Sequence, residues 1–196
     1  VSFRGSSVLN SMPKKKRTRT ERGVVVTVPK APLVVNVEVT NACNLECPMC
    51  ARTTSMTRPV QHMTESVFNK VIDQIDQMGV DKLFLHQFGE SLLHPQIYDF
   101  IDYAAQKQNI GLLSLSTNAT VLNEQITRQL LDTGLRHLVI SVDADTEETY
   151  NEVRGPDFDR TLKNTRRFLE LHREYGSRSR MDVNLTIIRM GIKVDQ

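Results

Sequence analysis

Stretches with the composition of β-strands alternate with stretches of helical periodicity along most of this 196-residue chain. Several of the strand-like stretches are nearly continuous apolar runs, which is typical of strands buried on both faces of a parallel sheet. The expected strands cover residues 33–39, 82–88, 111–116, 136–142 and 181–188. Parallel strands joined by helices form either a doubly wound sheet or a barrel, so the alternation predicts an α/β fold of one of these two kinds.

Helical segments occupy the intervals between the expected strands. The first is expected over residues 64–78, with Thr64 as its N-cap. Its apolar stripe is expected to consist of Val67, Phe68, Val71, Ile72, Ile75 and Met78. Asn123 is expected to cap a later helix, and Asp145 with Glu148 resembles a capping box before a shorter one. The helices therefore have recognisable starts as well as apolar faces.

Polar or small residues lie at the carboxyl ends of four of the expected strands. They are the cysteine segment after residue 39, Gly89-Glu90-Ser91, Ser116-Thr117-Asn118, and Ser141 with Asp143. In both candidate folds, functional residues gather at the carboxyl ends of the strands, which lie at one edge of the sheet. Loops are often polar in any case, so this distribution gains weight only from the cysteines beside it.

All three cysteines of the chain lie within one short segment, TNACNLECPMCAR, from Thr40 to Arg52. Cys43, Cys47 and Cys50 have the spacing C-x3-C-x2-C. An odd and tightly spaced set of cysteines does not predict a disulfide framework. It indicates a metal site in a protein of a reducing compartment.

Three kinds of site are compatible with this spacing. A structural zinc site needs four ligands, and the candidates for the fourth are His62, His86 and His94. A redox pair formed by Cys47 and Cys50 would leave Cys43 unexplained. Ligation of an iron–sulfur cubane by three thiolates fits better, because a short loop can aim three sulfurs at one cluster. Such a cluster keeps one iron open to an external ligand.

The cysteine segment and the strand ahead of it, LVVNVEVT, resemble the signature of the radical S-adenosylmethionine (SAM) enzymes. GVDKLFLHQFGESLLHP resembles the family's second-strand segment with its Gly-Gly-Glu-Pro motif, although Phe88 replaces a glycine and Ser91 replaces the proline. LSTNAT resembles the end of the third strand. VISVDADTEETYNEVRG resembles the fourth-strand segment of members with a C-terminal accessory cluster domain, the SPASM group. The similarity covers roughly residues 33–190.

The resemblance implies a partial (β/α)6 TIM-like barrel in which Cys43, Cys47 and Cys50 ligate a [4Fe-4S] cluster. SAM would bind the fourth iron through its amino and carboxylate groups. The reduced cluster would cleave SAM to methionine and a 5′-deoxyadenosyl radical, which abstracts hydrogen from a peptide or a small polar metabolite. An electron donor such as flavodoxin or ferredoxin would reduce the cluster.

The resemblance also implies a set of SAM contacts. They are Met49 along the adenine, Gly89 and Glu90 at the amino group, Ser141 and Arg154 at the carboxylate, and Asn118 and Asp143 near the ribose. Simpler interpretations exist for several of them. Met49 could fill a gap in the packing, Glu90 could cap the following helix, and Arg154 could form a surface ion pair. His94 is interpreted as loop structure rather than as an iron ligand.

Only five of six barrel units fit in the chain, so we expect a barrel truncated after about five β/α units. Residues 32–196 would form an incomplete radical SAM core domain, and residues 1–31 a basic, disordered tail. Residues 1–22 carry a net charge of +6, whereas the remainder carries −4. The tail contains PKKKRTR, which is similar to nucleic-acid-binding or nuclear-import patches, but we favour a disordered leader and expect no nucleic-acid partner.

The remaining expectations concern location and the alternative function. No apolar run approaches the roughly 20 residues of a membrane span, and no apolar segment follows the N-terminal charges as in a secretory signal. We therefore expect a cytoplasmic protein with no membrane partner. The alternative to an enzyme is a truncated, non-catalytic module of the same fold that holds a cluster or a zinc ion.

Overall fold

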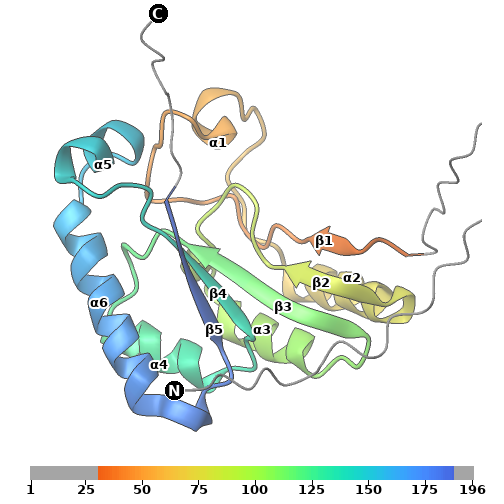
Figure 1. The fold of residues 1–196 in the computed structure, drawn as a ribbon. Helices are drawn as coiled ribbons and strands as arrows, with labels where there is room; N and C mark the ends of the chain where they lie inside the picture. Colours follow the sequence, from red (N-terminus) through yellow and green to blue (C-terminus); the bar gives the residue numbers. More distant parts are fainter. Residues whose placement is uncertain (1–30, 188–196) are drawn as a thin grey trace, which may run out of the picture. The chain divides into compact units, whose positions relative to one another are not determined.

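The structure, a computed structural model, describes residues 31–187. Five parallel strands form one sheet: β1 (Val34–Asn36), β2 (Val80–Phe84), β3 (Ile110–Thr117), β4 (His137–Ser141) and β5 (Asp182–Thr186). Their order in the sheet is their order in the sequence. The sheet therefore winds in one direction, as a barrel does, and lacks the reversal of a doubly wound sheet. The prediction of an open, partial α/β barrel is confirmed (Figure 1).

Helices cover one face of the sheet and leave the other face open (Figure 1). The four long helices are α2 (Glu65–Met78), α3 (Ile97–Ala105), α4 (Glu124–Asp132) and α6 (Phe158–Tyr175). The short ones are α1 (Ala51–Thr54), α5 (Glu147–Val153), and the 3₁₀ turns η1 (Ser91–Leu93) and η2 (Gly176–Arg178). The open face corresponds to the interior of a closed barrel.

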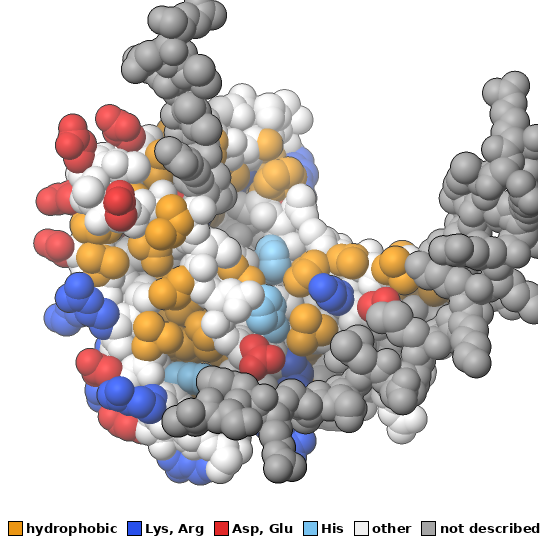
Figure 2. All heavy atoms as spheres, viewed as in Figure 1, with side chains coloured by type: hydrophobic (Ala, Val, Ile, Leu, Met, Phe, Trp, Pro, Cys, Tyr) orange, Lys and Arg blue, Asp and Glu red, His pale blue; other side chains and the backbone are white. Residues whose placement is uncertain are grey.

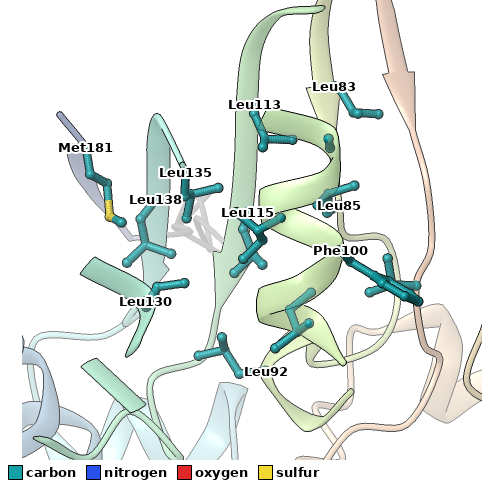
Figure 3. Packing of buried hydrophobic residues seen from close by; sticks show 14 of the residues in the cluster. Leu83, Leu85, Leu92, Phe100, Leu113, Leu115, Leu130, Leu135, Leu138 and Met181 are labelled. Atoms are coloured by element: carbon teal, nitrogen blue, oxygen red, sulfur yellow. The ribbon is translucent and has the colours of Figure 1, made fainter. Parts of the chain in front are cut away.

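The hydrophobic core fills the space between the sheet and the helices (Figure 3). Leu83 and Leu85 of the β2 segment are fully buried there, and Phe100 of α3 stacks on Phe68 of α2 with ring centroids 3.9 Å apart. Each such side chain stabilises the fold by about 1.5–3 kcal/mol. Because successive residues of a strand point to opposite faces, burial of Leu83 and Leu85 turns the residues between and after them toward the open face.

The predicted apolar stripe of the first helix is partly wrong. Phe68, Ile72 and Ile75 are buried, but Val67 and Met78 are 50% and 52% exposed. The buried arc is narrower than the stripe, because α2 meets the sheet along a single line of residues spaced three or four apart.

The N-caps of α2 and α4 are Thr64 and Asn123, as the sequence predicted, although Thr64 forms no side-chain cap hydrogen bond, and the N-cap of α5 differs from the prediction. Asn123 caps α4 as predicted, since its side-chain oxygen accepts a hydrogen bond from the backbone N–H of Ile126 at 2.9 Å. The expected capping box of Asp145 with Glu148 is wrong. Thr146 is the N-cap of α5, and its hydroxyl accepts the backbone N–H of Thr149 at 3.2 Å.

Two predictions concern residues outside the described range 31–187. The basic tail over residues 1–31 lies almost wholly outside the described residues, and so does the last residue of the strand expected at 181–188. Both stay predictions. Within residues 31–187, none of the helices has the length and apolar character needed to cross a membrane.

Candidate functional site

Cys43, Cys47 and Cys50 line one cavity of about 290 Å³ at the carboxyl end of the sheet. None of the three forms a disulfide. The predicted SAM contacts that line the same cavity are Met49, Gly89, Glu90, Asn118, Ser141 and Arg154. Asp143 is not among the lining residues, but it forms an ion pair with Arg154. The structure therefore brings together residues from four separate βα connections around the cysteines.

The cysteine loop is held by Arg52, a residue that the sequence analysis missed. Its guanidinium donates hydrogen bonds to the backbone carbonyls of Asn41 at 2.9 Å, Leu45 at 3.3 Å and Cys43 at 3.3 Å. One side chain thus fixes three carbonyls of a loop that has no regular secondary structure of its own. The only signal in the sequence is an arginine two residues after the third cysteine.

Replacing Arg52 with alanine is expected to lower the free energy of unfolding by about 2–3 kcal/mol, because three loop carbonyls lose a charged donor. Arg58 provides a matched control in the same region, since it pairs with Glu38 and its side chain is 52% exposed. Arg58→Ala should cost at most about 1 kcal/mol. Urea unfolding measures both variants, and equal losses would contradict the loop-holding role of Arg52.

Gly89 lies where two segments of backbone approach closely. A Cβ at this position would stand 2.1 Å from the carbonyl oxygen of Thr40 and 2.9 Å from that of Ala42. The backbone N–H of Glu90 donates to the Ala42 carbonyl at 2.8 Å. Phe88 occupies the position of the first glycine in the family motif. Gly89 occupies the position of the second, where the contact with the cysteine loop requires a residue without a Cβ.

Glu90 is buried at 2% exposure and ties three segments together. Its carboxylate accepts the backbone N–H of Asn118 at 2.7 Å and that of Leu92 at 3.2 Å. The second bond caps η1, so the interpretation as a helix cap is confirmed. Burial raises the pKa of this carboxyl above its usual range, and the two backbone N–H groups oppose that rise.

Cys43 is surrounded by polar groups from the cavity wall. The side-chain amide of Asn118 lies 3.9 Å from its sulfur and also donates to Asn44 at 3.1 Å. Burial raises the pKa of the Cys43 thiol, and the carboxylate of Glu90 adds to the rise, whereas Arg52 opposes it. Such a thiol stays protonated until a metal or another cation replaces its proton.

Arg154 connects the cysteine loop to the end of β4. Its Nη1 lies 3.8 Å from the sulfur of Cys47, whose thiol in turn faces the Arg154 carbonyl at 3.9 Å. Its Nη2 forms the ion pair with Asp143, which is 1% exposed. The side chain is mostly buried, so the interpretation of Arg154 as a surface pair is wrong. Its Nε is buried and has no hydrogen-bond partner among the described residues.

In a regular strand, Ser141 and Asp143 would point to the same face, but the strand does not extend that far. β4 ends at Ser141, and Asp143 has a φ of +61°. The reversal turns Asp143 into the protein, where it meets Arg154. Ser141 stays on the open face, with its hydroxyl 3.4 Å from that of Ser116 and 3.3 Å from that of Thr186.

His94 has the structural role that the sequence predicted. Its Nδ1 accepts the backbone N–H of Gln96 at 3.1 Å, so its Nε2 carries the proton and donates to the Met63 carbonyl at 2.9 Å. Both ring nitrogens are occupied. His86, in contrast, lines the cavity, although the sequence alone suggests only a possible zinc ligand at this position.

The three thiols do not form a single-ion site. Within residues 31–187, no three His, Cys, Asp or Glu side chains converge as ligands of one metal ion. An iron–sulfur cubane takes one cysteine per iron, so it does not require the sulfurs to meet at one atom. The cavity, the free thiols and the unpartnered Nε of Arg154 fit such a group together with a polar ligand.

Comparison with known proteins decides the family. The family model of the Radical SAM superfamily matches residues 37–187. This chain belongs to the Radical SAM superfamily. The matched span begins directly after β1 and runs through β5, so it contains every predicted site residue of this radical SAM chain.

Two relatives illustrate the range of the superfamily. The chain is 30% identical over 141 residues to the AdoMet-dependent heme synthase of Methanosarcina barkeri. The alignment covers 70% of this chain and 39% of that protein. The chain is 28% identical to the PqqA peptide cyclase of Bradyrhizobium diazoefficiens, covering 63% of this chain and 32% of the cyclase. The chain thus spans about a third to a half of the length of the curated relatives it matches.

Solved structures show the same fold. Streptococcus suis SuiB bound to S-adenosylmethionine superposes with a TM-score of 0.63 at 15% identity, over 84% of this radical SAM chain and 36% of SuiB. HydG, a maturase of the [FeFe]-hydrogenase, gives a TM-score of 0.63 at 18% identity, over 81% of this chain and 35% of HydG. At these identities the likeness establishes the fold alone.

Proposed function

We propose that this chain is the cluster-bearing core of a radical SAM enzyme. Cys43, Cys47 and Cys50 would ligate a [4Fe-4S] cluster, and SAM would occupy the open iron. The observation that carries the proposal is that the three free thiols share one cavity with the polar ends of β2, β3 and β4. The sequence contains no fourth cysteine, and both ring nitrogens of the buried His94 are occupied.

The protein groups around the sulfurs support this assignment. Arg154 and the Asn118 amide each direct an N–H toward a cysteine sulfur, at 3.8 Å and 3.9 Å. N–H donors at cluster sulfurs tune the electronic properties of a bound cluster. The positive charge of Arg154 also offsets negative charge at Cys47, and Asp143 holds the guanidinium in place.

The bound cluster and SAM would together supply a 5′-deoxyadenosyl radical for hydrogen abstraction from a substrate. The chain's own residues have three tasks. Arg52 fixes the loop so that its thiols keep their positions. Glu90 and Gly89 hold that loop against β3. Arg154 offers its unpartnered Nε to a polar group in the cavity.

The remaining SAM contacts follow from the family resemblance and the cavity lining. We assign Met49 to the adenine, Gly89 and Glu90 to the amino group, and Ser141 with Arg154 to the carboxylate. Asn118 and Asp143 would lie near the ribose. Because the carboxylate of Glu90 already accepts two backbone N–H groups, any contact with an ammonium would be an additional one.

Substrate and partners are proposed at the level of chemical class. PqqA peptide cyclase and mycofactocin maturase MftC are among the relatives, and SuiB has been solved with the precursor peptide SuiA. We propose a peptide or a small polar metabolite as substrate, and flavodoxin or ferredoxin as the electron donor. Residues 32–196 would form the catalytic core of a cytoplasmic protein.

Anaerobic reconstitution with iron and sulfide tests the proposed function. The protein should bind about four irons per chain and convert SAM to 5′-deoxyadenosine and methionine only when dithionite is present. Chromatography quantifies the 5′-deoxyadenosine. Bound zinc without SAM cleavage would contradict the proposal and favour the non-catalytic module.

A further inference from the structure

His86 differs from the other histidines of the described chain. His94, His137 and His172 each have a ring nitrogen within 2.9 Å of a protein oxygen, and His62 is exposed. Neither ring nitrogen of His86 has a hydrogen-bond partner among residues 31–187, and its Nδ1 is fully buried. Its Nε2 is not among the buried atoms, so it is the ring nitrogen that a ligand in the cavity can reach.

The position of His86 directs it toward the cavity of the cysteines. Leu85 faces the core, so its neighbour His86 faces the open side of the sheet and lines the cavity. The N–H of Leu85 donates to the carbonyl of Ser114 at 2.9 Å, which continues the pairing of β2 with β3 and brings His86 level with Ser116. The ring of Phe84 lies 5.3 Å from that of His86 and packs against it.

The side chains in this part of the cavity wall are uncharged. Burial and, to a smaller extent, the neighbouring His137 lower the pKa of His86 to about 4, so the imidazole is neutral at physiological pH. Ser116 and Ser141 supply two hydroxyls 3.4 Å apart on the same wall. Figure 2 shows histidine side chains in the middle of the open face, among hydrophobic and uncharged side chains and a few charged ones.

The charged residues of the cavity lie at other positions in its lining. Arg52 belongs to α1, Glu90 lies four residues beyond His86, and Arg154 follows α5. A zwitterionic amino-acid group is best held by such charged residues, whereas a neutral imidazole beside the Ser116 hydroxyl suits hydroxyl groups or ring nitrogens. SAM contains both kinds of group, in its methionyl and nucleoside parts.

We propose that His86, beside Ser116, is a hydrogen-bonding contact for the nucleoside part of SAM. This inference rests on the proposed function and adds a contact outside the family motifs. His86 binds through Nε2, because Nδ1 is sequestered in the wall. The residue acts in binding and not in proton transfer.

The test measures the dissociation constants of SAM, 5′-deoxyadenosine and L-methionine for the anaerobically reconstituted full chain by equilibrium dialysis. His86→Phe keeps a ring against Phe84 but removes both nitrogens. It should weaken binding of SAM and of 5′-deoxyadenosine by roughly 3- to 10-fold and leave methionine unchanged. His137→Phe is the matched control, since His137 bonds Ser114 on the same sheet but does not line the cavity.

The outcomes separate this inference from the proposed function. Equal SAM affinity in His86→Phe and the unsubstituted protein would overturn the role of His86 while leaving the SAM site intact. An equal loss in His137→Phe would also overturn it, because the effect would then be a general distortion of the sheet. Failure of the unsubstituted, iron-loaded protein to bind SAM would overturn both.

Discussion

Replacing Cys47 with alanine is expected to reduce the iron bound after anaerobic reconstitution from about four atoms per chain to nearly none. Cys47 is the most buried of the three cysteines, and its sulfur contacts both the guanidinium and the carbonyl of Arg154. Its loss removes one ligand of three and leaves the charge of Arg154 facing an apolar methyl group. Iron analysis and the absorbance of the cluster measure the effect.

His94→Ala is the matched control for this experiment. His94 is buried near the cavity, but its ring nitrogens are committed to Met63 and Gln96. The variant should retain the full iron content, although the loss of its packing against Phe100, with ring centroids 4.6 Å apart, lowers stability. Loss of the cluster in a folded His94→Ala protein would contradict the assignment of the ligands.

Replacing Gly89 with alanine is expected to destabilise the fold by about 3 kcal/mol and to loosen the cysteine loop. The new methyl group would meet the carbonyl oxygen of Thr40 at 2.1 Å and its carbon at 2.7 Å. Both are backbone atoms, so relief requires a shift of the segment that leads into Cys43. Urea unfolding reports the stability, and iron retention reports the state of the loop.

Gly155→Ala provides the comparison, since nothing lies within 4 Å of a Cβ at that position. Its φ of +94° still disfavours a side chain, so a cost of about 1 kcal/mol is expected. Iron retention should be unchanged in this variant. If Gly89→Ala proved no more harmful than Gly155→Ala, the close contact between the β2 end and the cysteine loop would be refuted.

The fold was predictable because its determinants are local. Apolar strands, helical periodicity and caps such as Asn123 are properties of short stretches of sequence. The choice between a barrel and a doubly wound sheet was not local, since it depends on which strands pair. The order β1-β2-β3-β4-β5 in the sheet decides in favour of the barrel.

The features of the site that could not be predicted from the sequence depend on contacts between distant segments. The three carbonyls bound by Arg52 converge only once the loop has folded. Asp143 leaves the strand face because its φ is positive, which the apolar pattern of β4 does not reveal. The orientation of His86 follows from alternation, but its lack of a partner is a property of the assembled wall.

The most direct test of the central claim is the electron paramagnetic resonance spectrum of the reconstituted, dithionite-reduced protein with and without SAM. Three cysteine ligands leave one iron of a [4Fe-4S] cluster open to SAM. SAM should therefore change the spectrum of the reduced cluster. A spectrum that is identical with and without saturating SAM would contradict the account.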